Sequence, residues 1–424
     1  MTEVTAVCYS RSMKLSQELA WRGLIHQSTY TDNSSLDTPG VVYYGIDPSA
    51  DSAHIGNYVA LMALRHFIDA GWKVVLLIGG GTGMIGDPGG KSEERNLLSP
   101  EQVEKNRASI ATQIKKVWGG QDFEMVNNAD WLADLRLLDF LRDAGKHFGM
   151  TMLMQRDYIA QRIGPGGTGM SFAEFAYTLL QGYDYWHLFK EKNATLQIGG
   201  SDQWGNMISG VDLIRKKEGA EAHVVTTPII INRATGKKFG KSEAGAIWLN
   251  PAKTSVYQFY QFWLNADDQG VIEYLKIFTL LSKEQIEVIE KEFTANPRDR
   301  AAQKALAHEV TTLVHGADRA QAAKRVSSAL FSGDYTELTT EDFELLAAEV
   351  TAIEAKAGAP LVGALVDAKL AKSMTEARRF VETGAVYLNG EKAVATADLS
   401  AVQPLQGYVV VRRGKKDMAL IKVI

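Results

Sequence analysis

The feature that most limits the possible folds is an alternation of strand, glycine turn and helix near the start of the chain. Residues 41–45 read Val-Val-Tyr-Tyr-Gly, an apolar strand that enters a glycine turn. Residues 54–70 then space their apolar side chains as one face of a helix, which stops at Gly71. A second apolar strand, 73–78, runs into the glycine-rich segment 79–83. Strands that alternate with helices in this way indicate a parallel sheet with crossover helices, so we expect an α/β fold.

The same alternation continues through the middle of the chain. Ser171 and Glu174 form a capping-box pattern, which predicts a helix to about Phe189. The elements expected after it are a strand at 195–198, a helix through Arg215, a strand at 227–231 and a mainly helical region from 250 to about 333.

The edge of this sheet is where we expect a ligand. In parallel α/β sheets, ligands bind beyond the carboxyl ends of the strands. The residues expected at that edge are Tyr43, Gly45, Gly80 and Asp87.

The composition of the chain argues against a Cys-rich metal site and against a membrane-spanning segment. The 424 residues are 46% hydrophobic and 23% charged, a balance typical of globular domains. The apolar run 74–78 is far too short to span a bilayer, and the first residues lack the pattern of a secretory signal. The single cysteine, Cys8, can form neither an internal disulfide nor a Cys-rich zinc site. We therefore expect a cytoplasmic protein with no protein-bound metal.

Charge is unevenly distributed along the chain. Residues 358–424 carry ten Lys and Arg against six Asp and Glu, whereas the whole chain has a net charge of −4. A basic C-terminal region on an otherwise acidic chain is typical of a protein that binds a polyanion such as RNA. An ordinary solvated surface could carry the same excess of positive charge. A capping box at 373–376 predicts a helix in this region, and the Asn389–Gly390 pair predicts a tight turn after a short strand.

Two short motifs carry most of the chemical information. Residues 51–57 set His54 and Asn57 three apart at the start of the first helix, and residues 238–242 place two lysines on a short glycine-containing loop. Either motif alone would fit a helix cap or a solvated loop. As a pair in this order they resemble the two nucleotide-binding motifs of the class I aminoacyl-tRNA synthetases. The reaction of that family, attack on an α-phosphate with loss of pyrophosphate, needs positioned charge more than a covalent catalyst.

A polar helix face points to a second ligand. Tyr177, Gln181 and Asp184 lie at i, i+4 and i+7, so they share one face of the helix. Buried polar groups need partners, and a polar ligand could supply them, whereas a solvated surface is the alternative. The apolar neighbours that predict a largely buried helix are Phe172, Phe175, Leu179 and Leu180.

Around this helix the chain resembles the bacterial tyrosyl-tRNA synthetases. The segments that match nearly letter for letter are 86–88, 179–184 and 196–206, and the likeness extends from about Leu15 to the end of the sequence. The resemblance implies an enzyme that activates L-tyrosine with ATP and Mg²⁺ to tyrosyl-adenylate. The enzyme would then transfer tyrosine to tRNA(Tyr), with release of AMP and diphosphate. It also implies a homodimer, to which the apolar segment 135–154 could supply the contact.

The resemblance further implies roles for individual residues. The tyrosine site would consist of Tyr43 and Asp184 at the phenolic hydroxyl, of Asp87, Tyr177 and Gln181 at the ammonium group, and of Gln203. ATP would be bound by Gly45, Asp47, Gly200 and Asp202, and its phosphates by Ser49, His54 and Asn57. The departing pyrophosphate would be bound by Lys91, Arg95, Lys238, Lys241 and Ser242. The residues expected to act in catalysis are Ser49, His54, Asn57, Lys238 and Lys241.

Three places depart from the usual pattern of that family. Tyr44 stands where relatives often carry a small Cys beside the ribose, and Asn57 stands where many carry a second His. A phenol at Tyr44 would either crowd the nucleotide or swing away from it. The segment 1–12 extends beyond the usual start, which leaves Met13 as a second possible start.

The resemblance also gives an expected domain organisation. A Rossmann-like catalytic domain that contains the dimer-forming insertion would occupy 1–245, and a helical anticodon-side domain 246–345. A small α+β RNA-binding domain would occupy 358–424, within which 361–390 resembles the RNA-binding domain of a ribosomal small-subunit protein. The residues expected to face tRNA phosphates are Lys369, Lys372, Arg378 and Arg379.

Two other functions stay open at this point. A tryptophanyl enzyme shares the fold and the chemistry, but the pair of Tyr43 and Asp184 favours tyrosine. A non-catalytic RNA-binding relative would use the same fold as a scaffold, and the intact His54, Lys238 and Lys241 argue against it. The sequence has no Walker-type glycine loop with Lys and Ser or Thr, which argues against ordinary nucleotide hydrolysis.

Overall fold

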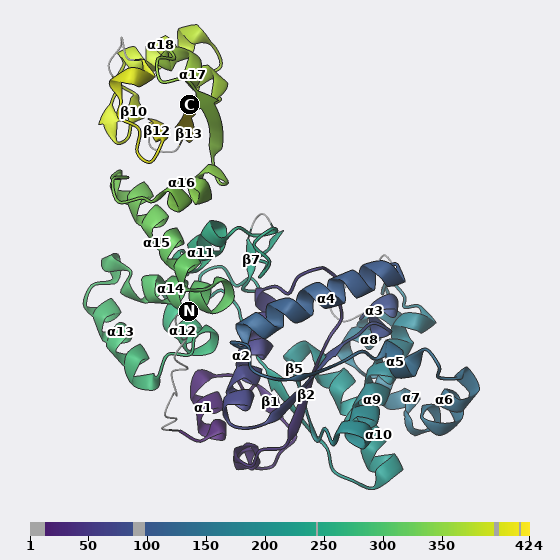
Figure 1. The fold of residues 1–424 in the computed structure, drawn as a ribbon. Coiled ribbons are helices and arrows are strands. Elements are labelled where there is room, and N and C mark those ends of the chain that lie inside the picture. The colour runs from purple at the N-terminus through teal and green to yellow at the C-terminus, as the bar shows by residue number, and fades with distance from the viewer. Residues whose placement is uncertain (1–12, 88–97, 243–244, 394–397, 415–416) are drawn as a thin grey trace. The chain divides into compact units, whose positions relative to one another are not determined.

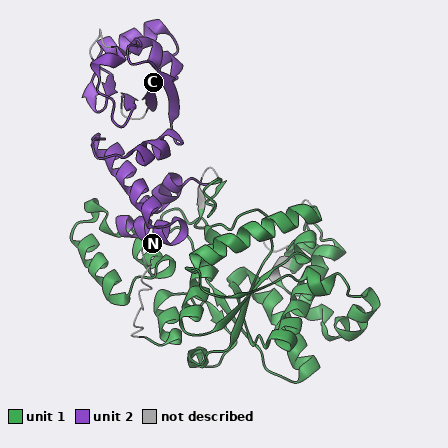
Figure 2. Ribbon diagram, viewed as in Figure 1, with its two compact units in different colours: residues 1–253, 267–302 green, residues 254–266, 303–424 purple. Residues whose placement is uncertain are grey.

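The computed structural model describes the chain except for residues 1–12, 88–97, 243–244, 394–397 and 415–416 (Figure 1). The residues fall into two compact units, one formed by 1–253 with 267–302 and the other by 254–266 with 303–424 (Figure 2). Within the described ranges, no helix has the length and apolar character needed to cross a membrane. The three-domain division expected from the sequence stays a prediction.

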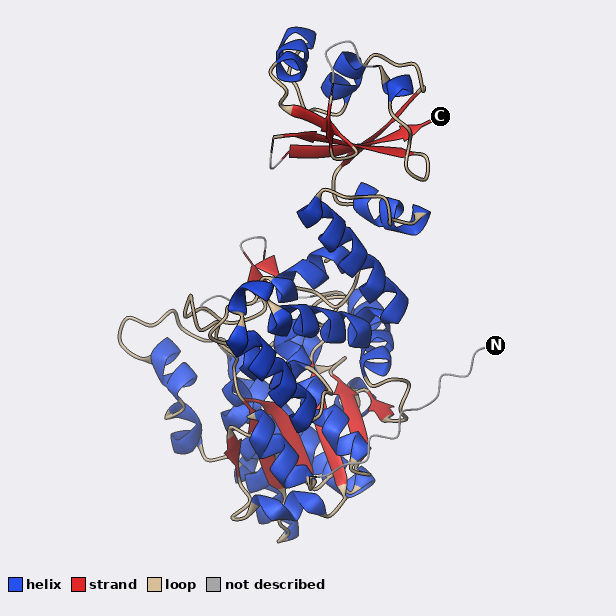
Figure 3. Ribbon diagram, turned by 90° about the vertical axis from the view of Figure 1, so that its left-hand side faces the viewer, coloured by secondary structure: helices blue, strands red, loops and turns tan. Residues whose placement is uncertain are grey.

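The first unit is built on a six-stranded sheet, drawn in red in the lower part of Figure 3. The strand order is β1–β6–β5–β2–β3–β4. In this sheet β1 runs antiparallel to β6, and the other neighbouring strands are parallel. The strands are β1 Gln27–Ser28, β2 Val41–Ile46, β3 Lys73–Ile78, β4 Glu124–Val126, β5 Leu196–Gly200 and β6 His223–Thr227. The predicted α/β fold with a parallel sheet is confirmed.

The helices of this unit include those that the sequence predicts. They are α1 Leu15–Arg22, α2 Ile55–Asp69, α3 Thr82–Ile85, α4 Pro100–Val117, α5 Ala129–Leu132, α6 Leu137–Asp143, α7 Met150–Met154, α8 Asp157–Ile163, α9 Phe172–Lys192, α10 Trp204–Glu218, α12 Val271–Phe278 and α13 Lys283–Ala295. The predicted capping box of α9 forms, because Ser171 Oγ accepts the Glu174 N–H and the Glu174 carboxylate accepts the Ser171 N–H. This reciprocal pair fixes where α9 begins.

Two local predictions are wrong. The strand expected at 227–231 lies upstream, as β6, and ends at Thr227. Proline has no N–H for a sheet ladder, so Pro228 ends the strand there. Phe172, expected to be buried, is 75% exposed, because it is the first residue of α9 and faces away from the core.

The second unit contains helices and a five-stranded sheet. Its helices are α11 Val256–Leu264, α14 Ala301–His315 (which begins at the boundary of the units), α15 Ala317–Ser332, α16 Thr340–Ala347, α17 Leu361–Asp367 and α18 Met374–Glu382. Its strands are β9 Thr351–Ala355, β10 Val386–Leu388, β11 Glu391–Lys392, β12 Tyr408–Arg413 and β13 Asp417–Val423, in the order β11–β10–β12–β13–β9. The predicted α+β character of the C-terminal region is confirmed.

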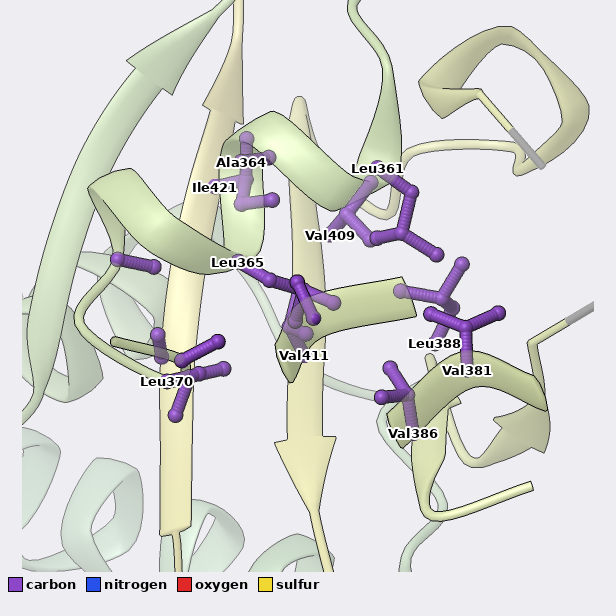
Figure 4. Close-up of a cluster of buried hydrophobic side chains, with 14 of the residues drawn as sticks. Leu361, Ala364, Leu365, Leu370, Val381, Val386, Leu388, Val409, Val411 and Ile421 are labelled. Carbon is purple, nitrogen blue, oxygen red and sulfur yellow. The ribbon is translucent and has the colours of Figure 1, made fainter. Parts of the chain in front are cut away.

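Both faces of this second sheet are covered. On one face, α17 and α18 supply Leu361, Leu365 and Val381, which pack against strand residues such as Val409 and Val411 (Figure 4). On the other face, a separate buried cluster joins strand side chains to α15 and α16; it includes Val326, Phe343, Leu346, Tyr408, Val410 and Leu420. The C-terminal sheet therefore shares its core with the two helices that precede it.

Candidate functional site

The first unit contains a cavity of about 400 Å³ at the carboxyl ends of β2 and β5, a size suited to a small-molecule ligand. Fourteen of the residues expected at the site line it: Tyr43, Gly45, Asp47, Ser49, His54, Asn57, Asp87, Tyr177, Gln181, Asp184, Gly200, Asp202, Gln203 and Lys238. Gly80, also expected at this edge, is not among the lining residues, and its N–H donates to Asn127 Oδ1. Segments that lie far apart in the sequence thus meet in one cavity.

The polar face of α9 forms one wall. Tyr177, Gln181 and Asp184 all line the cavity, as their spacing predicts. The Tyr177 hydroxyl donates a hydrogen bond to Asp47 Oδ2 at 2.8 Å, and Thr82 Oγ1 donates to Asp47 Oδ1 at 2.7 Å. Asp47 is thus turned toward α9. Burial and the carboxylates of Asp47 and Asp87 hold the pKa of Tyr177 well above its usual range, so the phenol stays a donor.

Asp184 is the most deeply buried carboxyl group of the cavity. It is 2% exposed and accepts hydrogen bonds from Asn128 Nδ2 (2.9 Å) and Trp131 Nε1 (2.8 Å). Burial raises the pKa of Asp184 to about 7 and outweighs these two hydrogen bonds, which lower it. In the folded protein this carboxyl group therefore gains or loses its proton near neutral pH.

The raised pKa predicts a pH-dependent stability. Because the folded pKa lies above the ordinary value of 3.8, the contribution of Asp184 to stability is complete at low pH and is lost as pH rises through about 7. We expect wild-type stability, relative to Asp184→Asn, to fall by up to about 1.4 kcal/mol per pH unit between about pH 4 and 7. Urea unfolding of both proteins across this range gives the difference, and a constant difference would contradict the assignment.

Three buried polar atoms in the cavity wall lack a hydrogen-bond partner among the described residues. They are the Tyr43 hydroxyl, Gln181 Oε1 and Gln197 Oε1. Buried polar atoms are nearly always paired in folded proteins, so three such atoms around one cavity indicate a polar ligand. Burial, with smaller effects from Tyr185 and Asp184, raises the pKa of Tyr43 well above its usual range and keeps its hydroxyl protonated.

Carboxylates gather at the side of the cavity where Tyr177 lies. Asp47 accepts from Tyr177 and Thr82, and Asp87 Oδ2 accepts from Gln203 Nε2 at 2.7 Å. Carboxylates and amide oxygens are the acceptors that an ammonium group requires. This end of the cavity can therefore receive a cation, whereas the end with Tyr43 and Asp184 can both donate to and accept from a hydroxyl.

The start of α2 forms another part of the cavity wall. His54 is its N-cap, and the ring Nδ1 accepts the Gly56 N–H at 3.0 Å. A neutral imidazole with an accepting Nδ1 carries its hydrogen on Nε2, which is then a donor. Asn57 Oδ1 accepts the His54 N–H at 3.1 Å, which leaves the Asn57 amide nitrogen as a donor as well. These two side-chain donors lie at the start of a helix, where the helix dipole favours an anion such as phosphate.

The lysine loop approaches the same wall. Phe239 is buried and contacts the rings of Tyr274 (4.3 Å between centroids) and Phe278 (5.7 Å), both on α12. Gly240 has φ +89°, and a Cβ there would lie 2.8 Å from Ile55 Cβ, so the approach requires glycine. Lys238 is exposed and lines the cavity.

The description of the loop residues and their neighbours is partial. Lys241 and Ser242 form the backbone of β7 (Lys241–Ser242), which pairs with β8 (Gly245–Ala246), and their side chains lie outside the described part of the structure. Lys91 and Arg95 also lie outside the described residues.

Tyr44 on β2 and Asn57 in the first motif, the two site residues that depart from the family pattern, interact with each other. Tyr44 is 6% exposed and lines the cavity, and its hydroxyl oxygen takes a hydrogen bond from the side chain of Asn57. Burial raises the pKa of Tyr44 to about 12, so it remains a phenol. Tyr44 therefore helps to hold the Asn57 amide within the wall.

Several residues of the site were not found from the sequence. Asn128, Trp131 and Thr82 hold the carboxylates of Asp184 and Asp47, and no motif marks them. Gln197 carried a usable signal, because it is a polar residue inside an otherwise apolar strand, and it is 2% exposed at the cavity wall.

The chain matches two protein families. Residues 36–332 match the family described as tRNA synthetases class I (W and Y), and residues 342–421 match the Tyrosine–tRNA ligase SYY-like C-terminal domain. The tyrosine–tRNA ligase of Geobacillus kaustophilus is 47% identical over 421 residues, covering 97% of this chain and 100% of that protein. The corresponding ligase of Limosilactobacillus fermentum is 45% identical, with the same coverage.

A solved structure shows the same likeness. The C-terminally truncated mitochondrial tyrosyl-tRNA synthetase of Aspergillus nidulans has a TM-score of 0.68 and 32% identity to this chain. The match covers 76% of this chain and 95% of that protein.

Proposed function

This chain belongs to the class I tyrosine–tRNA ligases, and from that premise we propose that its cavity holds tyrosine and ATP side by side. The chain ligates tyrosine to tRNA, using ATP, which decides between the tyrosine and tryptophan alternatives. The observation that carries the placement is the set of three unpaired buried polar atoms in the cavity wall, from Tyr43, Gln181 and Gln197.

Tyrosine would lie along α9. Its phenolic hydroxyl would accept a hydrogen bond from Tyr43 and contact Asp184, and its ammonium group would lie near Asp87, Tyr177 and Gln181. The carboxylate of the substrate would then point toward the start of α2. This orientation is supported by the separation of the acceptor groups from the donor groups at His54 and Asn57.

ATP would lie across the start of α2. In the reaction, a carboxylate oxygen of tyrosine attacks the α-phosphorus, a new P–O bond forms, and the bond to the bridging oxygen of pyrophosphate breaks. His54 Nε2 and the Asn57 amide would donate to phosphate oxygens as negative charge builds, and Lys238 would stabilise the departing pyrophosphate. Asp202 and Gly200 lie at the ribose side, and Ser49, Lys91, Arg95, Lys241 and Ser242 complete the proposed phosphate contacts.

Mg²⁺ would enter with ATP as a counter-ion of its phosphates. Among the residues that the structure describes, no three His, Cys, Asp or Glu side chains gather as metal ligands would. A magnesium ion that keeps waters and binds substrate phosphates needs no such protein cage.

The proposed site is tested by ATP–pyrophosphate exchange driven by amino acids. We expect tyrosine to support rapid exchange, and phenylalanine and tryptophan to support far less, because only the tyrosine hydroxyl pairs with Tyr43 and Asp184. Equal exchange with tryptophan would contradict the placement of the tyrosine hydroxyl. Complete absence of exchange would favour a non-catalytic scaffold.

The tRNA would contact α18 and its surroundings in the second unit. Lys369, Lys372, Arg378 and Arg379 are all exposed. The ion pair of Arg379 with Glu376 is long, at 3.8 Å, and the arginine is 67% exposed, so this pair leaves the guanidinium available to phosphate. The second step, attack of a terminal tRNA hydroxyl on the tyrosyl carbonyl with loss of AMP, would still occur in the first unit.

Charge reversal at α18 tests the tRNA contact. Arg378→Glu with Arg379→Glu should weaken tRNA binding by about tenfold or more, and should make the salt dependence of binding less steep by about one to two units of slope. The double lysine variant keeps both charges and should bind nearly as the wild type does. Fluorescence titration with tRNA at several salt concentrations measures both quantities, and unchanged binding would exclude this surface.

A homodimer is the proposed assembly, and its contact would be made by exposed apolar side chains of α6, of α7 and of the start of α9. Leu138 on α6 is 76% exposed and Phe172 on α9 is 75% exposed. The other exposed members are Leu137, Leu141, Met150, Met152 and Met154, most of them within the predicted segment 135–154. Exposed apolar patches of this kind usually mark a protein contact.

Leu138→Glu should weaken the dimer by about tenfold or more, because a carboxylate would be buried at the contact. Phe331→Glu is a matched control, since Phe331 is 95% exposed but lies on α15 in the second unit. Analytical ultracentrifugation gives the dissociation constant of each variant, and monomeric wild-type protein would contradict the proposal.

We place the enzyme in the cytoplasm, where its tRNA substrate is used. Cell fractionation tests this location.

A further inference from the structure

The segment that follows the lysine loop is hydrogen-bonded along the first motif. The Ile55 N–H donates to the Ile247 carbonyl (3.0 Å), and the Leu249 N–H donates to the Ala53 carbonyl (2.9 Å). The Ile247 N–H donates in turn to the carbonyl of Gly240, also at 3.0 Å. One residue, Ile247, therefore joins the backbones of both motifs. Its neighbour Trp248 is held beside the start of α2 by these bonds.

The side chain of Trp248 lies between a catalytic group and an ion pair. Its ring packs edge-on against the imidazole of His54, with 5.8 Å between centroids and 67° between planes. The ammonium of Lys253 lies 5.0 Å from the centroid of the Trp248 ring and pairs with Asp51 at 2.6 Å. Asp51 and His54 belong to the same motif. The indole of Trp248 therefore contacts one residue of this motif, His54, directly, and is linked to another, Asp51, through Lys253.

The orientation of the imidazole matters because the two ring nitrogens have different tasks. Nδ1 accepts the Gly56 N–H, so Nε2 carries the hydrogen and is the donor of a ring that lines the cavity. The hydrogen bond at Nδ1 fixes the position of that atom, but a bond to one atom does not by itself set the tilt of the ring. The Trp248 ring packs against the imidazole, and both residues line an adjoining hollow of about 570 Å³.

We propose that Trp248 is a positioning residue for His54, and that the ion pair of Lys253 with Asp51 holds Trp248 in place. The indole would keep the His54 Nε2–H directed at the phosphate, so that the donor is in place before charge develops. This inference rests on the proposed role of His54. It assigns to Trp248 no contact with either substrate.

The kinetic test compares Trp248→Leu with Trp248→Phe. We expect Leu to lower kcat for tyrosyl-adenylate formation by about tenfold with tyrosine KM unchanged, because a misaligned donor weakens transition-state stabilisation alone. Phe restores an aromatic edge and should recover most of the rate. In a His54→Ala background, the Trp248→Leu change should have no further effect, since the group that it positions is gone. Equal losses in both backgrounds would overturn the inference.

A second readout does not depend on activity. Nitrogen-15 NMR of labelled histidine reports which ring nitrogen carries the hydrogen, and His54 is assigned from the His54→Ala spectrum. A change in the tilt of the ring would weaken the bond from the Gly56 N–H to Nδ1, which sets where the hydrogen lies. We therefore expect Nε2–H in the wild type and a mixture of both forms in Trp248→Leu, with a smaller change of the same kind in Lys253→Met. An unchanged His54 spectrum in Trp248→Leu would overturn the inference even if the rate fell. If the wild type failed in pyrophosphate exchange, the proposed function would fall, whereas the spectra would still decide the role of Trp248.

Discussion

Replacing His54 by alanine is expected to lower kcat for tyrosyl-adenylate formation by about 10²- to 10³-fold, with little change in tyrosine KM. Loss of one fixed donor to a developing oxyanion has an effect of this size. Tyrosine binding should persist, because the groups assigned to it lie on β2 and α9 and at Asp87 and Gln203, and do not include His54. Stopped-flow measurement of adenylate formation, with tyrosine concentration varied, separates the two constants.

The control for this substitution concerns the helix cap. His54 also caps α2 by accepting the Gly56 N–H, so alanine should lower stability by about 1 kcal/mol as well. His54→Asn keeps a capping acceptor but has a shorter side chain, and should restore stability without restoring the rate. If Asn restored the rate and the stability together, the loss in His54→Ala would be structural.

The second large effect is expected in substrate discrimination. Tyr43→Phe should narrow the ratio of kcat/KM for tyrosine over phenylalanine by about 5- to 150-fold, the range that corresponds to about 1–3 kcal/mol for one buried hydrogen-bonding group. The Tyr43 hydroxyl has no partner among the described protein residues and lies at the cavity wall. A substrate hydroxyl would be that partner.

Tyr58→Phe is a matched control for Tyr43→Phe. The Tyr58 hydroxyl is also buried without a partner among the described residues, but Tyr58 does not line the cavity. Its loss should leave the discrimination ratio unchanged. Steady-state kinetics with both amino acids gives the ratios. An effect of equal size in the two variants would show that the Tyr43 phenol does not recognise the hydroxyl of the substrate.

Local patterns in the sequence predict the parts of the fold that depend on local chemistry. The alternation of apolar runs with glycine turns predicted β2, α2 and β3, and the capping box predicted the start of α9. The spacing of Tyr177, Gln181 and Asp184 predicted their shared wall. These signals lie within single elements, where side-chain period and backbone geometry decide the outcome.

The rest depends on contacts between distant segments. Asn128 and Trp131 donate hydrogen bonds to Asp184, although each lies more than fifty positions before it in the sequence. Nothing in the sequence around Asn128 or Trp131 indicates that either residue belongs to the site. The strand β9 escaped prediction because its side chains are mostly exposed and its pairing partner, β13, lies far along the chain. β6 ends at Thr227 because Pro228 has no N–H to donate to a neighbouring strand. The apolar residues that follow Pro228 led to the wrong prediction that the strand continued through them.

The pairing of β9 with β13 has a consequence for how the enzyme is made. Because β13 lies between β12 and β9, the sheet of the second unit cannot assemble on a ribosome before residues 417–423 have emerged. All strands of the first sheet precede residue 228, so this sheet can assemble much earlier. Proteolysis of stalled nascent chains would reveal the two stages in turn. The nascent chain would then be able to bind tyrosine and ATP before it can bind tRNA. A truncated mRNA that encodes only the first unit would yield a chain that activates tyrosine but binds tRNA much more weakly.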